Sequence, residues 1–341
     1  MNVTPQPQCL LWEACKSGDV HKVPELLANP QVDVNSSSPD RLDTPLHLAC
    51  RFGRAEVVRL LLRHPAIEVD LGNAGGASPF NIACQEGHRD VADMMLADQR
   101  IQPNMVNFRN ATPLYKACQN GHLDVLDTLF MDRRVEVNTP TESCTPLWKA
   151  SENGRLDVVL LLLASDYIVD TTATSLPGAE RWHNTTAATW ARLYPTLPRY
   201  HNHTPWDHDR CRLHGPEIAS LIESYEGDPL RVRVQLRSRP EIRSRFIARL
   251  FGVVIFFVDN LLRPSQSTVM AATTAATMSK VPEAEVLAVA EALRFLQIAA
   301  RLPLDLQMVL CNRAFSSARD VVPSHEVEPC FRWLARSSTW L

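Results

Sequence analysis

A seven-residue string that recurs in the first half of the chain constrains its fold more than any other feature. The string reads TPLHLAC from Thr44, and it returns with substitutions from Ser78, Thr112 and Thr145. The successive starts are 34, 34 and 33 residues apart. Units of this length are too small to bury their own apolar faces, so they must stack on one another. The sequence therefore predicts a solenoid.

Each unit is predicted to hold two helices. The Thr or Ser hydroxyl can accept a bond from the first turn, and the Pro that follows has no amide to leave unpaired. Gly53, Gly87, Gly121 and Gly154 stand nine residues after each Thr or Ser, where a positive φ ends the first helix. Apolar runs such as 57–62 then predict the second helices, and apolar residues two apart, as in 135–137, predict a short extended segment between units.

This pattern resembles the ankyrin-repeat family, whose signature is T-P-L-H-x-A at about 33 residues per repeat. The resemblance reaches back to residues 9–15, a divergent first copy that we expect to cap the amino end. It implies an all-α ankyrin-repeat solenoid of five or six helix-turn-helix units with β-hairpins, followed by a helical domain. By the same resemblance, the chain would be a protein-protein interaction scaffold or adaptor that binds a partner on the concave face of the repeats.

The domain divisions follow from where the repeat pattern weakens. Residues 1–170 hold the regular repeats, and residues 171–228 hold a degenerate sixth copy that starts at Thr186. An insertion at 193–213 splits this copy, and its three prolines, Pro195, Pro198 and Pro205, predict an irregular loop. The alternative is that the insertion is a gene-model artefact in an ordinary repeat.

Residues 229–341 are predicted to form a helical carboxy-terminal domain. Its first part, 229–263, holds eight Arg and two acidic residues, which we interpret as a solvated face. The apolar run 250–258 is too short to span a membrane, which takes about 20 residues. We therefore expect no membrane span, and because the whole chain has a net charge of −3, we expect no nucleic-acid partner. We expect a monomer in the cytoplasm or the nucleus, because no secretory signal opens the chain.

Nine cysteines are an odd number, and four of them, Cys15, Cys50, Cys84 and Cys118, recur at one position of the repeat. Equivalent positions of adjacent repeats lie on the order of 10 Å apart, too far for a disulfide or a shared metal ion. We interpret these four as small buried core residues.

The insertion carries the one cluster of metal-ligand residue types, namely His201, His203, His208, Cys211 and His214. Imidazole and thiolate groups at short spacing can bind zinc, so a zinc-binding protein is one alternative. The other interpretation is a His-rich surface loop, because the spacing matches no known structural zinc signature. The chain has no nucleotide-binding or catalytic motif, so we expect no enzyme and no cofactor.

Partner contacts are expected just before each capping Thr or Ser and just before each glycine, because these positions carry the contacts in the family that the chain resembles. The best single candidates are Phe52, Phe108 and Arg109, since aromatic and Arg side chains dominate binding energies. The full predicted set is Arg41, Asp43, Arg51, Phe52, Gln85, Glu86, Phe108, Arg109, Gln119, Asn120, Glu142, Trp148, Glu152 and Asn153. Tyr115 and Trp148 replace the family's His, which puts its usual hydrogen bond in question.

A second functional alternative is a substrate receptor of a ubiquitin ligase. The segment 306–311 resembles the SOCS box that follows ankyrin repeats in such receptors. Leu306 and Cys311 are separated by four residues where that motif has three, so this alternative rests on a likeness of family.

Overall fold

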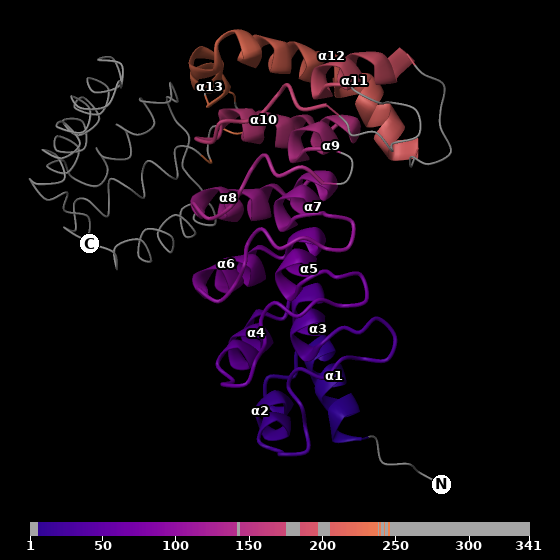
Figure 1. Ribbon diagram of the computed structural model, residues 1–341, viewed down its shortest axis with the longest axis vertical. Coiled ribbons are helices and arrows are strands. Elements are labelled where there is room, and N and C mark those ends of the chain that lie inside the picture. The colour runs from indigo at the N-terminus through magenta and orange to yellow at the C-terminus, as the bar shows by residue number, and fades with distance from the viewer. Residues whose placement is uncertain are drawn as a thin grey trace, which may run out of the picture. The chain divides into compact units, whose positions relative to one another are not determined.

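The computed structural model describes residues 6–141, 144–174, 185–196 and 205–237, and the single residues 239, 242 and 245. Its helices follow one another in pairs, and the pairs stack into two parallel columns (Figure 1). The helices are α1 (Pro7–Ser17), α2 (Lys22–Leu27), α3 (Pro45–Arg51), α4 (Ala55–Leu62), α5 (Pro79–Glu86), α6 (Arg89–Ala97), α7 (Pro113–Asn120), α8 (Leu123–Met131), α9 (Pro146–Glu152), α10 (Leu156–Ala164), α11 (Ala187–Leu193), the short 3-10 helix η1 (Tyr194–Thr196), α12 (Pro205–Gly227) and α13 (Pro229–Arg237).

The starts and ends of the first helices confirm the predicted signals. The hydroxyls of Thr44, Ser78, Thr112 and Thr145 each accept the backbone amide three residues on, at 3.4, 3.2, 3.1 and 3.3 Å. Proline follows each of them at the first helical position. The glycine nine residues later has a positive φ in every copy, as in Gly87 at 82°. Each repeat therefore carries its own start and stop signals.

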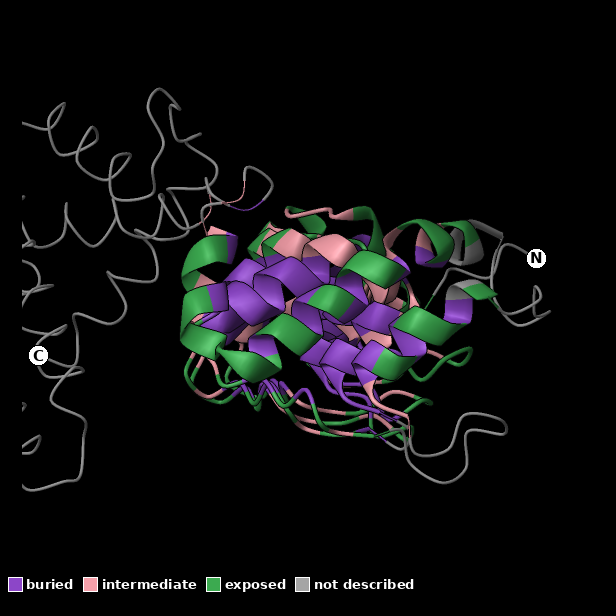
Figure 2. Ribbon diagram, turned by 90° about the horizontal axis from the view of Figure 1, so that it is seen from above, coloured by how far each residue is buried: buried purple, intermediate pink, exposed green. Residues whose placement is uncertain are grey.

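The core lies between the two columns and between successive repeats. Figure 2 shows the buried residues concentrated where the helices face one another, with exposed residues on the outer turns and the loops. Leu46, Phe80 and Leu114 fill one layer of this core from successive first helices. The cysteines at the shared repeat position are fully buried among them, which confirms their predicted place in the core. The stack is thus held by burial repeated at each interface.

In the loops between repeats, where the sequence predicts β-hairpins, the described residues form no paired strands. Among the described residues, the only β-type pairing is one isolated bridge between Thr174 and Thr186. Side-chain amides take over the role of strand pairing. Asn104 donates its Nδ2 to the carbonyl of Arg134 at 2.6 Å, and its Oδ1 accepts the amide of Glu136 at 2.9 Å.

The same bridge recurs along the stack, and we call each copy a rung. Asn35 and Asn138 make both bonds of the rung to the following repeat, as Asn104 does. The remaining rung, between those of Asn35 and Asn104, has Asp70 in place of Asn. Asp70 makes only one bond, in which its Oδ2 accepts the amide of Gln102 at 3.0 Å. Consecutive repeats are therefore joined by side chains where a sheet would use its backbone.

A helix with the same kind of start as the earlier first helices follows Thr186, where the sequence predicts a degenerate sixth repeat. The Thr186 hydroxyl accepts the amide of Thr189 at 3.3 Å and so caps α11, which packs on α9. Trp148 donates its Nε1 to the carbonyl of Thr185 at 3.0 Å and stacks on Trp190 at a centroid distance of 5.4 Å. The repeat contacts therefore continue across a longer connection.

The second helix of this repeat corrects the predicted loop. Residues 205–213, which were expected to be irregular, belong to α12, a continuous helix that also holds the predicted second-helix segment from His214. Pro205 is the first residue of α12, a position where proline is compatible with a helix because its missing amide would be unpaired there in any case. Proline is compatible with both a helix start and a loop, and for residues 205–213 the predicted loop was wrong.

The end of the described chain packs on the last repeats. Arg233 of α13 donates its Nη2 to the carbonyl of Tyr167 at 2.9 Å and to the hydroxyl of Tyr225 at 3.2 Å. The chain divides into two compact units, Met1–Leu236 and Arg237–Leu341. The helices predicted beyond residue 245 lie outside the described residues, so the helical carboxy-terminal domain stays a prediction.

Candidate functional site

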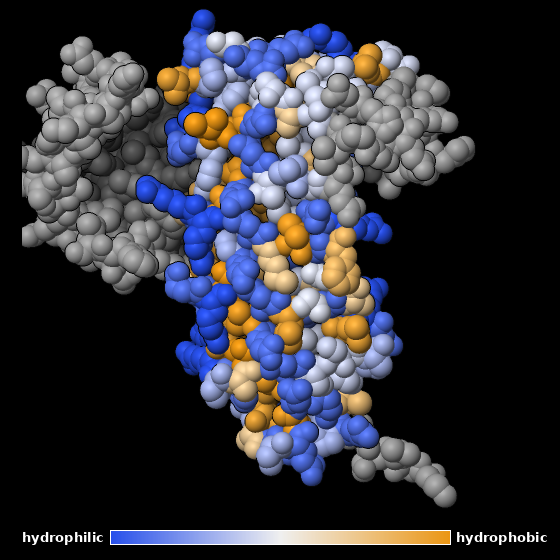
Figure 3. All heavy atoms as spheres, in the orientation of Figure 1, coloured by the Kyte–Doolittle hydropathy of each residue, from blue (hydrophilic) through white to orange (hydrophobic). Residues whose placement is uncertain are grey.

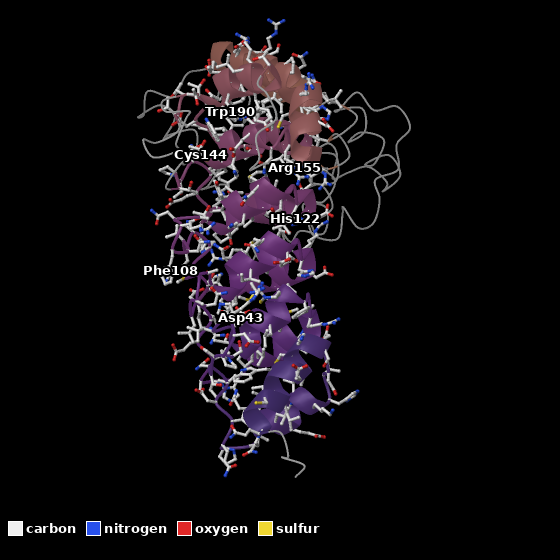
Figure 4. The ribbon with its side chains drawn as sticks, turned by 90° about the vertical axis from the view of Figure 1, so that its right-hand side faces the viewer. Asp43, Phe108, His122, Cys144, Arg155 and Trp190 are labelled. Carbon is white, nitrogen blue, oxygen red and sulfur yellow. The ribbon has the colours of Figure 1, made fainter. Side chains whose placement is uncertain are left out.

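The candidate site is the side of the stack formed by α3, α5, α7, α9 and the loops that precede them, which we call the inner face. In Figure 4, Asp43 and Phe108 mark these loops, with Phe108 at the outer edge. Figure 3 shows that hydrophilic side chains cover much of the visible surface and that separate hydrophobic groups interrupt them along the stack.

The predicted contact residues differ widely in accessibility. Arg41, Phe52, Glu86, Phe108 and Arg109 are exposed, and Asp43 and Trp148 are buried. Glu142 lies outside the described residues. The remaining members of the predicted set are half-buried: Arg51, Gln85, Gln119, Asn120, Glu152 and Asn153.

Asp43 holds two repeats together. Its side chain is 2% exposed and accepts bonds from Arg51 Nη2 and Asn73 Nδ2, both at 2.8 Å. Arg51 also lies 3.8 Å from Glu86 Oε1 on the next first helix. Because both oxygens of Asp43 are engaged and covered, its role in this structure is to fix the loop against α3. It has no accessible atom for a partner.

The position occupied by His47, Asn81, Tyr115 and Trp148 links each repeat to the next. His47 Nε2 bonds the carbonyl of Ala77 at 2.8 Å, and Asn81 Nδ2 donates to the carbonyl of Ala111 at 2.9 Å. Tyr115 reaches the Sγ of Cys144 at 3.7 Å. The change from His to Trp therefore preserves the hydrogen bond, since Trp148 makes it with its indole nitrogen.

His47 is a neutral structural residue. Burial lowers its pKa, which outweighs the opposing effects of the Ala77 carbonyl and of Asp43. Its Nδ1 accepts the amide of Thr44 at 3.1 Å while Nε2 donates to Ala77. A neutral ring satisfies both bonds, so His47 has no spare nitrogen for catalysis or for a metal ion.

Two further predicted residues also join repeats. Asn120 Nδ2 donates to the carbonyl of Gln85 at 2.7 Å, and Asn153 Nδ2 donates to the carbonyl of Gln119 at 2.9 Å. These bonds run from one repeat to the same place in the preceding one. A substitution at either Asn would disturb the stack as well as the inner face.

The aromatic candidates are exposed and held in place. Phe52 is 38% exposed, and the Nζ of Lys16 lies 5.8 Å from the centroid of its ring. Phe108 is 75% exposed, and its amide donates to the carbonyl of Gly75 at 3.0 Å. Its ring lies so close to Gly76 that a Cβ there would come within 2.5 Å of it. The backbone of the neighbouring loop therefore positions the ring.

The structure adds two residues that the sequence reasoning missed, Lys116 and Lys149. Both lie four residues after a capping Thr, on α7 and α9. Burial lowers the pKa of Lys116, and the positive charges of Arg109 and Lys149 lower it further. A Lys at the same repeat position in consecutive copies was the available sequence signal. The cations of this part of the inner face thus gather around Lys116.

The metal candidates are not brought together within the described residues. His201 and His203 lie outside them, as does the side chain of His208. Cys211 is buried on α12 and donates its thiol to the carbonyl of Glu152 at 2.8 Å. His214 is half-buried on the same helix. No group of three or more His, Cys, Asp or Glu side chains among the described residues is arranged to hold a metal ion.

The buried cysteines are unreactive as they stand. Burial raises the pKa of Cys15 to about 12 and raises those of Cys50, Cys84 and Cys118 further. Since the thiolate is the nucleophile and the metal ligand, protonated thiols without access to solvent do neither.

Comparisons with known proteins agree with the repeat geometry. A family model described as ankyrin repeats (3 copies) matches residues 11–107 and 100–174. The protein named "Ankyrin repeat and LEM domain-containing protein 2" from Mus musculus is 44% identical over 50 residues, which are 14% of this chain and 5% of that protein. The Rattus norvegicus protein of the same name gives the same values. The chain therefore covers 5% of the length of these curated relatives.

Two other expectations from the sequence concern a membrane span and the segment 306–311. Of the helices in the described residues, none combines the length and the apolar character needed to cross a membrane. The segment 306–311, which suggested a ubiquitin-ligase receptor, lies outside the described residues.

Proposed function

Because the chain belongs to the ankyrin-repeat family, with its repeats in residues 11–174, we propose that it is a scaffold or adaptor that binds a protein partner on the inner face. Proteins of this family are generally non-enzymatic interaction modules. The observation that carries the proposal is the exposed group of Phe52, Phe108 and Arg109. Aromatic and Arg side chains that stay exposed on a rigid support are typical of binding hot spots.

The accessible and the structural residues of the inner face are separate sets. The structural set forms hydrogen bonds that hold the repeats together, and it consists of Asp43, Trp148, Asn120 and Asn153. The side chains of Phe52 and Phe108 lie on top of this framework and contribute nothing to the buried core. A partner can therefore contact them without rearranging the stack, which lowers the cost of binding.

The test compares two tagged variants with the unaltered full chain in affinity purification from cells, read out by mass spectrometry. The first variant combines Phe52→Ala, Phe108→Ala and Arg109→Ala. The matched control combines Ile168→Ala, Arg63→Ala and Arg133→Ala, which removes one apolar and two Arg side chains that are exposed beyond the second helices. Circular dichroism and thermal unfolding establish that all three proteins are folded.

We expect the first variant to lose at least one partner that the unaltered chain and the control variant both retain. The proposal is overturned if every partner persists with the first variant, or if the control variant loses the same partners. In either case binding would not depend on the inner face.

A further inference from the structure

A group of three cations on the inner face lies at the junction of the fourth and fifth repeats. We call Arg109, Lys116 and Lys149 the basic patch. Lys116 and Lys149 occupy the same position on α7 and α9, and Arg109 lies in the loop that leads into α7. The three residues come from three separate elements, and the electrostatic effect of Arg109 and Lys149 on Lys116 shows that they lie near one another in the stack.

The cation at the centre of the patch forms no ion pair with a carboxylate of the described residues. The Nζ of half-buried Lys116 has a neutral contact, the Oε1 of Gln119 at 3.4 Å. Lys149 forms an ion pair with Glu152. Among the described residues, which leave out Glu142 of the next loop, no carboxylate forms an ion pair with Lys116 or Arg109. Burial, and then repulsion from Arg109 and Lys149, disfavour the charged form of Lys116 and lower its pKa. An external anion would relieve that cost.

The exposed Phe108 ring stands next to Arg109 at the edge of the patch. It is anchored to the neighbouring loop through the carbonyl of Gly75 and through contact with Gly76. Because contact with Gly76 restricts the ring, covering it removes less conformational freedom, so it is well suited to bind an apolar side chain. The patch and the ring together favour a ligand that carries both carboxylates and apolar groups.

The spacing of the two lysines favours an extended chain. Equivalent positions in adjacent repeats lie on the order of 10 Å apart, one helix diameter. An extended peptide in the polyproline II conformation has three residues per turn and rises about 3.1 Å per residue, so two acidic residues three positions apart lie on the same side and span about the same distance. A nucleic acid fits less well, because its binding rests on many phosphate contacts, and the chain has a net charge of −3.

We propose that the basic patch binds an extended acidic segment of a protein partner, with carboxylates three residues apart and an apolar side chain against Phe108. This inference rests on the proposed function of the inner face and specifies the chemistry of its partner. Lys116 and Lys149 receive the two carboxylates, Lys149 is shared between Glu152 and the partner, and Arg109 adds positive charge beside Lys116.

The probe is a fluorescein-labelled peptide of four Glu-Leu-Ser units, and its binding to the full chain is measured by fluorescence anisotropy in low-salt buffer. A peptide of four Gln-Leu-Ser units tests the need for carboxylates, and an unlabelled single-stranded DNA of similar length tests the class of ligand. The patch variant is Arg109→Gln with Lys116→Gln. Its matched control is Arg63→Gln with Arg133→Gln, two exposed Arg side chains that follow the second helices α4 and α8.

We expect the Glu peptide to bind at least tenfold more tightly than the Gln peptide, and we expect the patch variant to lose about tenfold in affinity. The control variant should bind as the unaltered chain does, although both variants lose two positive charges. Added salt should weaken binding, because the contacts are between charges.

Three results would overturn the inference: no binding of the Glu peptide, equal binding by the patch variant, or displacement of the peptide by the DNA. The proposed function has a separate readout. If the peptide fails to bind while cellular partners still depend on Phe52, Phe108 and Arg109, the inner face remains the binding site and only its acidic ligand is wrong.

Discussion

Replacing Asp70 by Asn is expected to stabilise the repeat stack. At the equivalent rungs an Asn side chain both accepts an amide and donates to a carbonyl of the next repeat. Asp70 accepts the amide of Gln102, but its buried Oδ1 has no hydrogen-bond partner. A carboxylate has no proton to give to the carbonyl of Arg100, which takes the place that Arg134 has in the rung of Asn104. The Asn variant restores the missing bond.

The expected gain follows from two contributions at this rung. The new amide-to-carbonyl hydrogen bond contributes about 0.5–1.5 kcal/mol, and removal of an unpaired buried acceptor adds a share of about 1–3 kcal/mol. Because Asp70 is half-buried, we expect a total near the lower end, about 1–2 kcal/mol. For a unit of this size, 1 kcal/mol corresponds to a shift in Tm of about 2–4 °C.

The gain should depend on pH. Burial raises the pKa of Asp70 from its ordinary value of 3.8, and the charge of Asp98 raises it further. The folded state therefore binds the proton more tightly than the unfolded state, so the free energy of unfolding falls as pH rises from 3.8 through the folded pKa. Above that pKa, the full free-energy cost of holding the ionised Asp70 carboxylate in the folded state applies. The Asn variant lacks it, so its advantage is largest at neutral pH and shrinks as the medium becomes acidic.

Urea unfolding followed by circular dichroism at neutral and at acidic pH measures the difference. The matched variant is Asn104→Asp, which creates the same defect at an intact rung and should lose about as much stability as Asp70→Asn gains. If Asp70→Asn leaves the unfolding free energy unchanged or lowers it at neutral pH, the assignment of the missing bond is refuted. A pH-independent gain would show that the carboxylate charge is not its source.

Three further predictions concern the ends and the interior of the stack. Gly121→Ala should cost about 1–2 kcal/mol for a residue at positive φ, because its Cβ would meet the movable side chain of Arg155. Gly154→Ala should cost more, because its Cβ would lie 2.7 Å from the backbone nitrogen of Cys211. Equal losses of Tm in the two variants would contradict this prediction. Trp148→Phe should lower the unfolding free energy by about 1 kcal/mol through the lost bond to the Thr185 carbonyl, and an unchanged urea midpoint would argue against that bond. Iodoacetamide should modify exposed Cys9 in the folded protein and should reach the buried thiols of Cys15, Cys50, Cys84 and Cys118 only after unfolding. Mass spectrometry of the peptides measures the labelling. Labelling of the buried thiols before unfolding would mean that the core opens.

The repeats could be predicted from the sequence because their signals are local. A capping Thr, its proline and the glycine nine residues on all act within one helix, and the structure places them as expected. The start of α12 could not be predicted in the same way. Pro205 is equally compatible with a loop and with a first helical turn, and packing against the fifth repeat decides between them.

The candidate site was harder to predict, because burial depends on neighbouring repeats. Asp43 was expected to contact a partner, yet Asn73 of the following repeat covers one of its oxygens. Lys116 and Lys149 are unremarkable as single residues, and their importance arises from stacking beside Arg109. Phe52 and Phe108 were predicted by residue type, and the structure leaves both exposed.

The contacts that begin the sixth repeat have a consequence for how this chain tolerates changes in length. Thr174 pairs with Thr186, and Trp148 bonds the carbonyl of Thr185, so both ends of the intervening segment are fixed by the repeats themselves. Doubling the length of a loop whose ends are held costs only about 0.6 kcal/mol, because the entropy of loop closure grows slowly with length. The segment is therefore a place where an epitope tag or a reporter domain can be inserted while the register of the following repeat stays the same.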